Sequence, residues 1–139
     1  MTKKIIGYTT GVFDLFHIGH LNILKKAKLN CDYLIVGITT DELSELSKGK
    51  RPIIPFEERM EIISAIKYVD KVVPQFNYNK VEAWNNLKFD IMIVGDDWKG
   101  SDTWNALEKE FKKLGVKIIY FPYTKTISST KIRGILNSF

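Results

Sequence analysis

The amino-acid sequence predicts an α/β protein, a doubly wound parallel sheet of about five strands with helices on both faces. Two observations lead to this prediction. Short apolar segments alternate with segments of helical period along all 139 residues. Polar and glycine-rich motifs directly follow the apolar segments, as they do where ligands bind beyond the carboxyl ends of parallel strands. The length suits a single domain over residues 1–139, and no repeat or linker interrupts the pattern.

Five apolar segments are predicted to form the strands of this sheet. Residues 32–39 and 90–95 are almost entirely apolar, as expected for strands that are buried on both faces. The five predicted strands are residues 4–9, 32–39, 71–74, 90–95 and 116–122.

The segments that connect these strands are predicted to be helical. Leu21, Leu24 and Ala27 recur at helical spacing. Pro55 stands near a helix entrance and is followed by acidic residues, which suit the helix dipole, and Gly115 closes a later helix. The predicted helices are residues 20–28, 55–66, 81–87, 103–115 and 128–139, the last with Ser128 or Ser129 as its N-cap.

Composition narrows the class of partner. The net charge is +5, from 21 basic and 16 acidic residues, and no tract of five basic residues occurs. This pattern favours small phosphorylated ligands over nucleic acid, although excess lysine could simply solvate the surface. No apolar run could span a bilayer, and no signal peptide is recognisable. The single Cys31 fits a reducing cytoplasm and is interpreted as a small buried residue. We therefore expect a cytoplasmic protein without membrane or nucleic-acid partners.

The stretch TTGVFDLFHIGH, residues 9–20, contains the only two histidines of the chain. His17 and His20 lie three apart at a helix entrance, where they share a face beside unpaired N–H groups. Gly11 and Gly19 allow the backbone to approach a ligand closely. The pattern predicts an anion site, although neither Walker A nor GxGxxG is present. Metal ligation and a purely structural pair are the alternatives, but structural zinc needs four ligands and Cys31 is the only cysteine.

Residues 11–20, GVFDLFHIGH, resemble the HxGH signature of the cytidylyltransferase-like nucleotidyltransferases. GDDWKG at 95–100 and ISSTKI at 127–132 resemble motifs of the glycerol-3-phosphate cytidylyltransferase branch, and the resemblance extends over nearly the whole chain. It implies a Rossmann-like fold and the transfer of a cytidylyl group from CTP to glycerol 3-phosphate. The products would be pyrophosphate and CDP-glycerol, a precursor of a cell-wall or capsular polymer.

The reaction that this resemblance implies is an in-line attack on the α-phosphorus. Because the attacking phosphate oxygen is already anionic, catalysis requires positioning and charge neutralisation rather than a strong base. His17 and His20 would act at the α- and β-phosphates, and Lys48 and Lys50 would clamp the phosphates from a mobile loop, a solvated basic loop being the alternative. Mg²⁺ is expected to arrive with the nucleotide rather than at a dedicated metal site. A homodimer is also implied.

The resemblance further implies two groups of binding residues. An aspartate at 96 or 97 could accept a hydrogen bond from the cytosine amine. Arg59 would hold the acceptor phosphate or form a surface salt bridge, and Asp14 could instead hold its own turn. The expected nucleotide-binding residues are Thr10, Gly11, Val12, Phe13, Gly19, Asp96, Asp97, Thr124, Ile127, Ser128, Ser129 and Thr130, and the expected acceptor-binding residues are Asp14, Arg59, Lys67, Trp98 and Tyr123.

The chain departs from the family pattern in its last loop. Tyr123, Lys125 and Thr126 stand where relatives carry an arginine, an acid and a glycine. In addition, residues 49–60 resemble the heptose-phosphate adenylyltransferase branch. Two alternatives therefore stand beside the first interpretation. One is a related enzyme that uses another phospho-alcohol, such as phosphocholine, phosphoethanolamine or a sugar phosphate, or that uses ATP; the other is a nucleotide-binding sensor without turnover.

Overall fold

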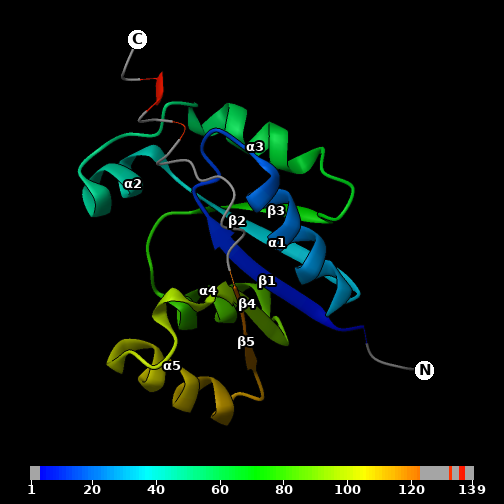
Figure 1. The fold of residues 1–139 in the computed structure, drawn as a ribbon. Helices are drawn as coiled ribbons and strands as arrows, with labels where there is room; N and C mark the ends of the chain where they lie inside the picture. Colours follow the sequence, from blue (N-terminus) through cyan, green and yellow to red (C-terminus); the bar gives the residue numbers. More distant parts are fainter. Residues whose placement is uncertain (1–3, 123–131, 133–134, 137–139) are drawn as a thin grey trace.

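The computed structural model describes residues 4–122, 132 and 135–136, and its centre is one parallel five-stranded sheet (Figure 1). The strand order is β3-β2-β1-β4-β5, so the chain first builds one half of the sheet and then crosses to the other side of β1. All four neighbouring pairs are parallel, as the alternation of apolar and helical segments predicted. The strands are β1 (Ile6–Gly11), β2 (Tyr33–Thr39), β3 (Lys71–Gln75), β4 (Ile91–Gly95) and β5 (Lys117–Phe121).

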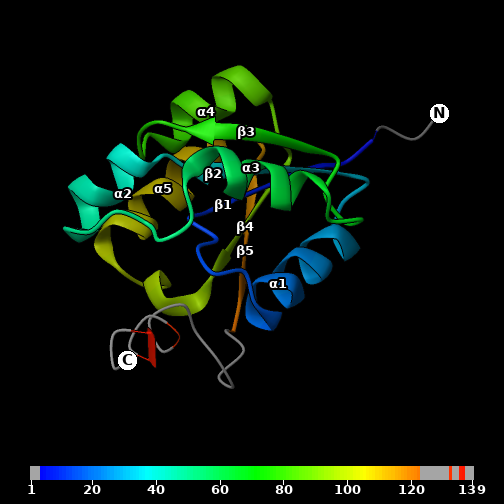
Figure 2. The ribbon, with the colours of Figure 1, turned by 90° about the horizontal axis from the view of Figure 1, so that it is seen from above.

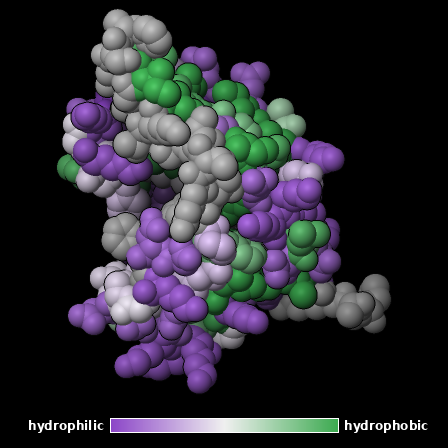
Figure 3. All heavy atoms as spheres, in the orientation of Figure 1, coloured by the Kyte–Doolittle hydropathy of each residue, from purple (hydrophilic) through white to green (hydrophobic). Residues whose placement is uncertain are grey.

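Helices cover both faces of this sheet, which confirms the doubly wound architecture (Figures 1 and 2). On one face, α1 (Ile18–Leu29) and α3 (Phe56–Ser64) contribute Leu24, Ala27 and Ile63 to a core with the sheet. On the other face, α4 (Lys80–Leu87) and α5 (Asp102–Lys113) pack over a second core that contains Phe89 and Phe111. The outer surface around α5 is hydrophilic (Figure 3), as its amphipathic sequence requires.

A helix that the sequence analysis did not predict, α2 (Asp41–Lys48), follows β2. The hydroxyl of its N-cap, Thr40, accepts a hydrogen bond from the Leu43 N–H at 3.2 Å, and Gly49 ends the helix in the left-handed conformation with φ +75°. The expectation of a loop around Lys48 is therefore wrong, because Lys48 is the last residue of this helix.

The other helix ends agree with the predictions to within a few residues. Pro55 is the N-cap of α3 rather than its first residue, and two glutamates occupy the first turn as expected. Gly115 follows α5 with φ +78°. The helix predicted for residues 128–139 lies almost entirely outside the described residues. Within the described part of the chain, no helix is long and apolar enough to cross a bilayer.

The start of β1 packs directly against Cys31, which lies between α1 and β2. A Cβ atom on Gly7 would lie 2.7 Å from the Cys31 Sγ and 3.0 Å from its Cβ. Cys31 is half-buried, and burial raises the pKa of its thiol, so the side chain is a packing element.

We expect Gly7→Ala to lower the free energy of unfolding by about 1–3 kcal/mol, because the added methyl group overpacks this contact. Urea denaturation of Gly7→Ala, Cys31→Ala and the double variant measures the effect. The double variant should recover part of the loss, because the Sγ at 2.7 Å is then removed. Strict additivity of the two losses would contradict this explanation.

Candidate active site

The turn that joins β1 to α1 lies at the switch point of the sheet. β1 lies between β2 and β4 in the sheet. From β1 the chain continues through β2 to β3 on one side, and it then forms β4 and β5 on the other side. Ligands of doubly wound sheets bind in the crevice that forms beyond the carboxyl ends of such strands. The predicted anion site, residues 9–20, therefore occupies the position that this fold offers to a ligand.

His17 and His20 together form the N-terminal cap of α1. The Nδ1 of His17 accepts a hydrogen bond from the Gly19 N–H at 3.0 Å, and the Nδ1 of His20 accepts one from the His17 N–H at 3.2 Å. This is a reciprocal capping box built from two imidazoles. The rings stack with their centroids 3.9 Å apart, and His20 also contacts the rings of Phe13 and Phe16. The prediction that the histidines share one face at a helix entrance is confirmed.

The capping bonds fix the protonation of both rings. Because each Nδ1 accepts a hydrogen bond, each neutral ring carries its proton on Nε2. Burial lowers the pKa of His17, and burial together with the His17 charge lowers the pKa of His20 to about 4, against a smaller opposing effect of Asp14. Neither Nε2 meets an acceptor among the described residues, and no unpaired side-chain nitrogen of that part of the chain is buried. The site therefore presents two accessible, neutral N–H donors.

We expect the free energy of unfolding to decrease as the pH is lowered from 6.5 toward about 4. In this range an imidazole of the unfolded chain binds a proton, whereas His20 in the folded chain stays neutral. The unfolded state thus binds more protons, and acid favours it. Urea midpoints at several pH values measure this effect. His20→Gln keeps a residue suited to the capping box and should flatten the dependence of the urea midpoint on pH. An unchanged pH profile in this variant would contradict the assignment of the effect to His20.

The backbone between β1 and α1 adopts an unusual conformation. Phe13 and Leu15 have φ values of +55° and +51°, a left-handed region that costs about 1–2 kcal/mol for each non-glycine residue. Strain of this kind persists where the surroundings enforce it, often at functional sites. In the part of the chain that the structure describes, no acceptor receives the Phe13 N–H. The turn therefore offers a backbone donor beside the two imidazoles.

Asp14 fastens this turn to the segment before α3. Its carboxylate accepts hydrogen bonds from the N–H groups of Ile53 and Ile54, both at 2.8 Å, and the residue is only 3% exposed. The interpretation that Asp14 holds its turn is confirmed. A carboxylate that is buried and bonded in this way favours the structural role over the expected contact with the acceptor.

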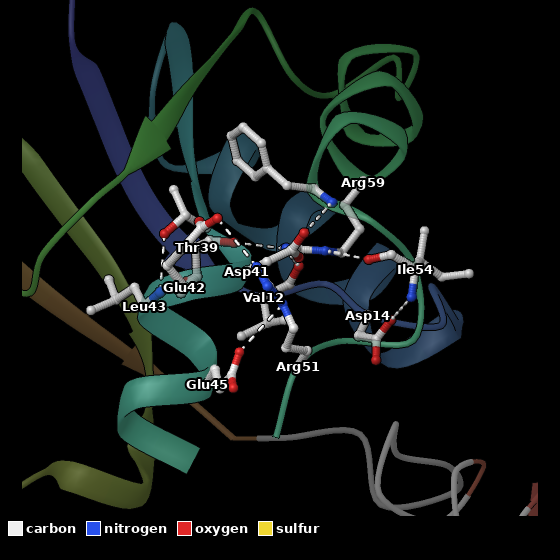
Figure 4. Close-up of polar contacts among 12 residues, drawn as sticks. Val12, Asp14, Thr39, Asp41, Glu42, Leu43, Glu45, Arg51, Ile54 and Arg59 are labelled. Carbon is white, nitrogen blue, oxygen red and sulfur yellow. Dashed lines mark hydrogen bonds and ion pairs between the residues drawn. The ribbon is translucent and has the colours of Figure 1, made fainter. Parts of the chain in front are cut away.

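Arg59 is the most deeply buried charged residue of the described chain, at 1% exposure. Its guanidinium donates to the carbonyls of Val12 and Thr39, each at 2.8 Å, to the Ile54 carbonyl at 2.9 Å, and to the Asp41 carboxylate at 2.6 Å (Figure 4). The interpretation as a surface salt bridge is wrong. The ion pair with Asp41 is internal rather than on the surface, and a side chain without exposed area cannot hold an acceptor phosphate in this conformation.

Most of the remaining predicted residues that the structure describes lie near the carboxyl edge of the sheet. Lys67 does not, because it lies between α3 and the start of β3, where Asp70 bonds Leu34 near the start of β2. Thr10 and Gly11 end β1, and Gly19 donates its N–H to His17. Lys48, Lys50 and Lys67 are exposed, as are Asp96 and Asp97, which with Trp98 form a short 3₁₀ helix directly after β4. Six predicted residues lie outside the described part of the chain, as do Lys125 and Thr126; the six are Tyr123, Thr124, Ile127, Ser128, Ser129 and Thr130.

Two features of the site were not predicted from the sequence. Asp41, which pairs with Arg59 and also accepts from the Phe56 N–H at 3.2 Å, is 18 residues away from the arginine, so no local spacing indicated the pair. The left-handed Phe13 likewise has no signal in residue type. Among the described residues, no group of three histidine, cysteine or acidic side chains is arranged to hold a metal ion.

Comparisons with known proteins agree with this geometry. Residues 8–135 match the family model described as cytidylyltransferase-like. The chain is 39% identical to the glycerol-3-phosphate cytidylyltransferase of Bacillus subtilis, with 94% of this chain and 95% of that protein covered. It is 40% identical to a FAD synthase of Thermococcus sibiricus, with 96% and 91% covered. A crystal structure of a lipopolysaccharide core biosynthesis protein from Thermoplasma volcanium has a TM-score of 0.77 and 31% identity, with 88% of this chain and all of that chain covered. On these matches and on the histidine pair at the switch point, the chain belongs to the cytidylyltransferase-like family.

Proposed function

We propose that this protein transfers the cytidylyl group of CTP to glycerol 3-phosphate and releases pyrophosphate. The observation that carries the proposal is the pair of accessible Nε2–H donors of His17 and His20, placed with the Phe13 N–H at the switch point. Such donors suit the α- and β-phosphates of a nucleotide. The similarity over 94% of the chain to a protein named glycerol-3-phosphate cytidylyltransferase supports the choice of both substrates.

The proposed step is an in-line displacement. A phosphate oxygen of the acceptor forms a bond to the α-phosphorus, and the bond from that phosphorus to the bridging oxygen of pyrophosphate breaks. Because the nucleophile is already ionised, the histidines do not have to remove a proton. Their neutral N–H groups instead stabilise the negative charge that develops on the non-bridging and leaving oxygens.

Other predicted residues complete the proposal. The exposed ammonium groups of Lys48 and Lys50 would neutralise phosphate charge, and the exposed Asp96 or Asp97 would accept from the cytosine amine. Mg²⁺ would enter as the metal complex of CTP, since Mg²⁺ is commonly held by substrate phosphates with one or two carboxylates, and it would add charge neutralisation. A homodimer, which light scattering would detect, stays a prediction.

Pyrophosphate release by the purified protein with magnesium tests the proposal. CTP and ATP are each paired with glycerol 3-phosphate, phosphocholine, phosphoethanolamine and a heptose phosphate. Release with CTP and glycerol 3-phosphate alone is the expected result. Release with another pair would support the same mechanism with a different nucleotide or acceptor. CTP binding without pyrophosphate release in any combination would favour a nucleotide-binding sensor without turnover.

One alternative has an observation in its favour. The chain is 40% identical to a protein named FAD synthase over 96% of its length. This match supports a nucleotidyltransferase with a different nucleotide or acceptor. The ATP arms of the same assay distinguish it.

A further inference from the structure

The buried guanidinium of Arg59 joins three separate segments of the chain. It holds Val12 of the histidine turn, Thr39 at the end of β2, and Ile54 of the segment that follows the two lysines (Figure 4). Asp14 adds a second link, because it binds the N–H of the same Ile54 from the histidine turn. The turn, the strand end and the segment before α3 are thereby fixed in one frame.

The bond to Val12 determines where the next peptide N–H points. No peptide bond among the described residues is cis, and in a trans peptide the carbonyl and the N–H point in opposite directions. Because the Val12 carbonyl is directed at the Arg59 Nη1, the Phe13 N–H is directed away from the guanidinium. The Phe13 N–H meets no acceptor in the described part of the chain. The left-handed φ of +55° at Phe13 is maintained in the same arrangement.

We propose that Arg59 is a positioning residue of the nucleotide site, which turns the Phe13 N–H toward a bound phosphate by holding the Val12 carbonyl inward. The inference rests on the proposed function in one respect, that the ligand of the histidine turn is a nucleotide phosphate. Arg59 itself touches neither substrate. Its role is to hold the donor in place before the ligand arrives, so that no backbone rearrangement is needed when charge develops.

The role depends on the shape of the guanidinium more than on its charge. Asp41 lies 2.6 Å from Nη2 and offsets the positive charge, whereas four acceptors in different directions require the planar fork. Lysine would keep the charge but cannot reach all four acceptors from one ammonium. Arg59→Lys is therefore the informative variant. Arg51→Lys is the matched control, since Arg51 pairs with Glu42 and Glu45 on the surface at 3.2 and 3.3 Å (Figure 4).

The experiment measures the affinities for CTP and for pyrophosphate by calorimetry, and kcat and the KM of glycerol 3-phosphate by pyrophosphate release. For Arg59→Lys we expect both affinities and kcat to fall by about tenfold or more, because the donor is displaced. The KM of glycerol 3-phosphate should stay within about twofold, as should every constant of Arg51→Lys.

Three results would overturn the proposal. A raised KM for glycerol 3-phosphate with unchanged CTP affinity would show that Arg59 contacts the acceptor. Lower thermal stability with unchanged affinities would show that it supports only the fold. If Arg59→Lys does not fold, the amide resonance of Phe13 in the wild-type protein is the test. The proposal requires this resonance to shift when pyrophosphate binds, and an unshifted resonance would refute it. Binding of CTP and pyrophosphate needs no acceptor, so a wild-type protein that binds both but releases no pyrophosphate would refute the proposed reaction alone.

Discussion

His17→Asn is expected to lower kcat by about 10²–10³ while the protein stays folded. Asparagine is among the best N-cap residues, so it can replace the His17 Nδ1 as acceptor of the Gly19 N–H. It is too short to place a donor where the imidazole Nε2–H lies. The substitution therefore separates the two roles that His17 combines, capping of α1 and donation to a phosphate. Steady-state pyrophosphate release with CTP and glycerol 3-phosphate measures the loss.

A second N-cap supplies the matched control. Ser101 caps α5 through a bond from the Trp104 N–H at 3.3 Å, and Ser101→Ala removes that cap at a cost of about 1 kcal/mol. We expect Ser101→Ala to be less stable than His17→Asn and yet fully active. If His17→Asn retains a kcat within about threefold of the wild type, the donor role is refuted.

The sequence was sufficient to predict the sheet and the place of the site. All five apolar segments became strands. β2 and β4 are buried along almost their whole length and have the nearly continuous apolar composition of such strands, whereas the edge strands β3 and β5 are only partly buried. The histidine pair was located because its spacing, its helix entrance and the preceding strand are all local properties of residues 9–20. The capping box was not predicted, although its two partners are three residues apart, because a capping box is ordinarily built from a hydroxyl side chain and a Glu or Gln rather than from two imidazoles.

Two further features could not be predicted in this way, each for a physical reason. Helix α2 is eight residues long and buries only Leu43 and Ser44, so its apolar period is too short to stand out from a polar loop. The burial of Arg59 depends on carbonyls from three separate segments, which come together only in the folded chain. A family resemblance at Arg59 therefore suggested a substrate contact, while tertiary packing assigns the side chain to the interior.

Asp14→Asn is expected to lower the free energy of unfolding by about 2–4 kcal/mol, which is a large part of the stability of an ordinary domain. The wild-type carboxylate accepts from the Ile53 and Ile54 N–H groups, one on each oxygen. An asparagine offers a single oxygen, so its amide NH₂ must face one of these N–H donors and leave it without an acceptor. Urea denaturation measures the loss. Asp32→Asn is the matched control, because within the described chain the Asp32 carboxylate accepts only from the exposed Ile5 N–H, at 2.8 Å, and the variant should lose less than about 1 kcal/mol.

The activity of Asp14→Asn carries the argument one step further. Asp14 is almost completely buried, so we expect a loss of kcat to come mainly from movement of the turn that contains Phe13 and His17. We expect the CTP affinity to fall while the KM of glycerol 3-phosphate is unchanged, which is the pattern expected for Arg59→Lys. Asp14 and Arg59 both bond Ile54 but carry opposite charges. If both variants show this pattern, its cause is the position of the turn and not the charge of either side chain. Opposite shifts in CTP affinity would instead show that their charges act on the nucleotide directly.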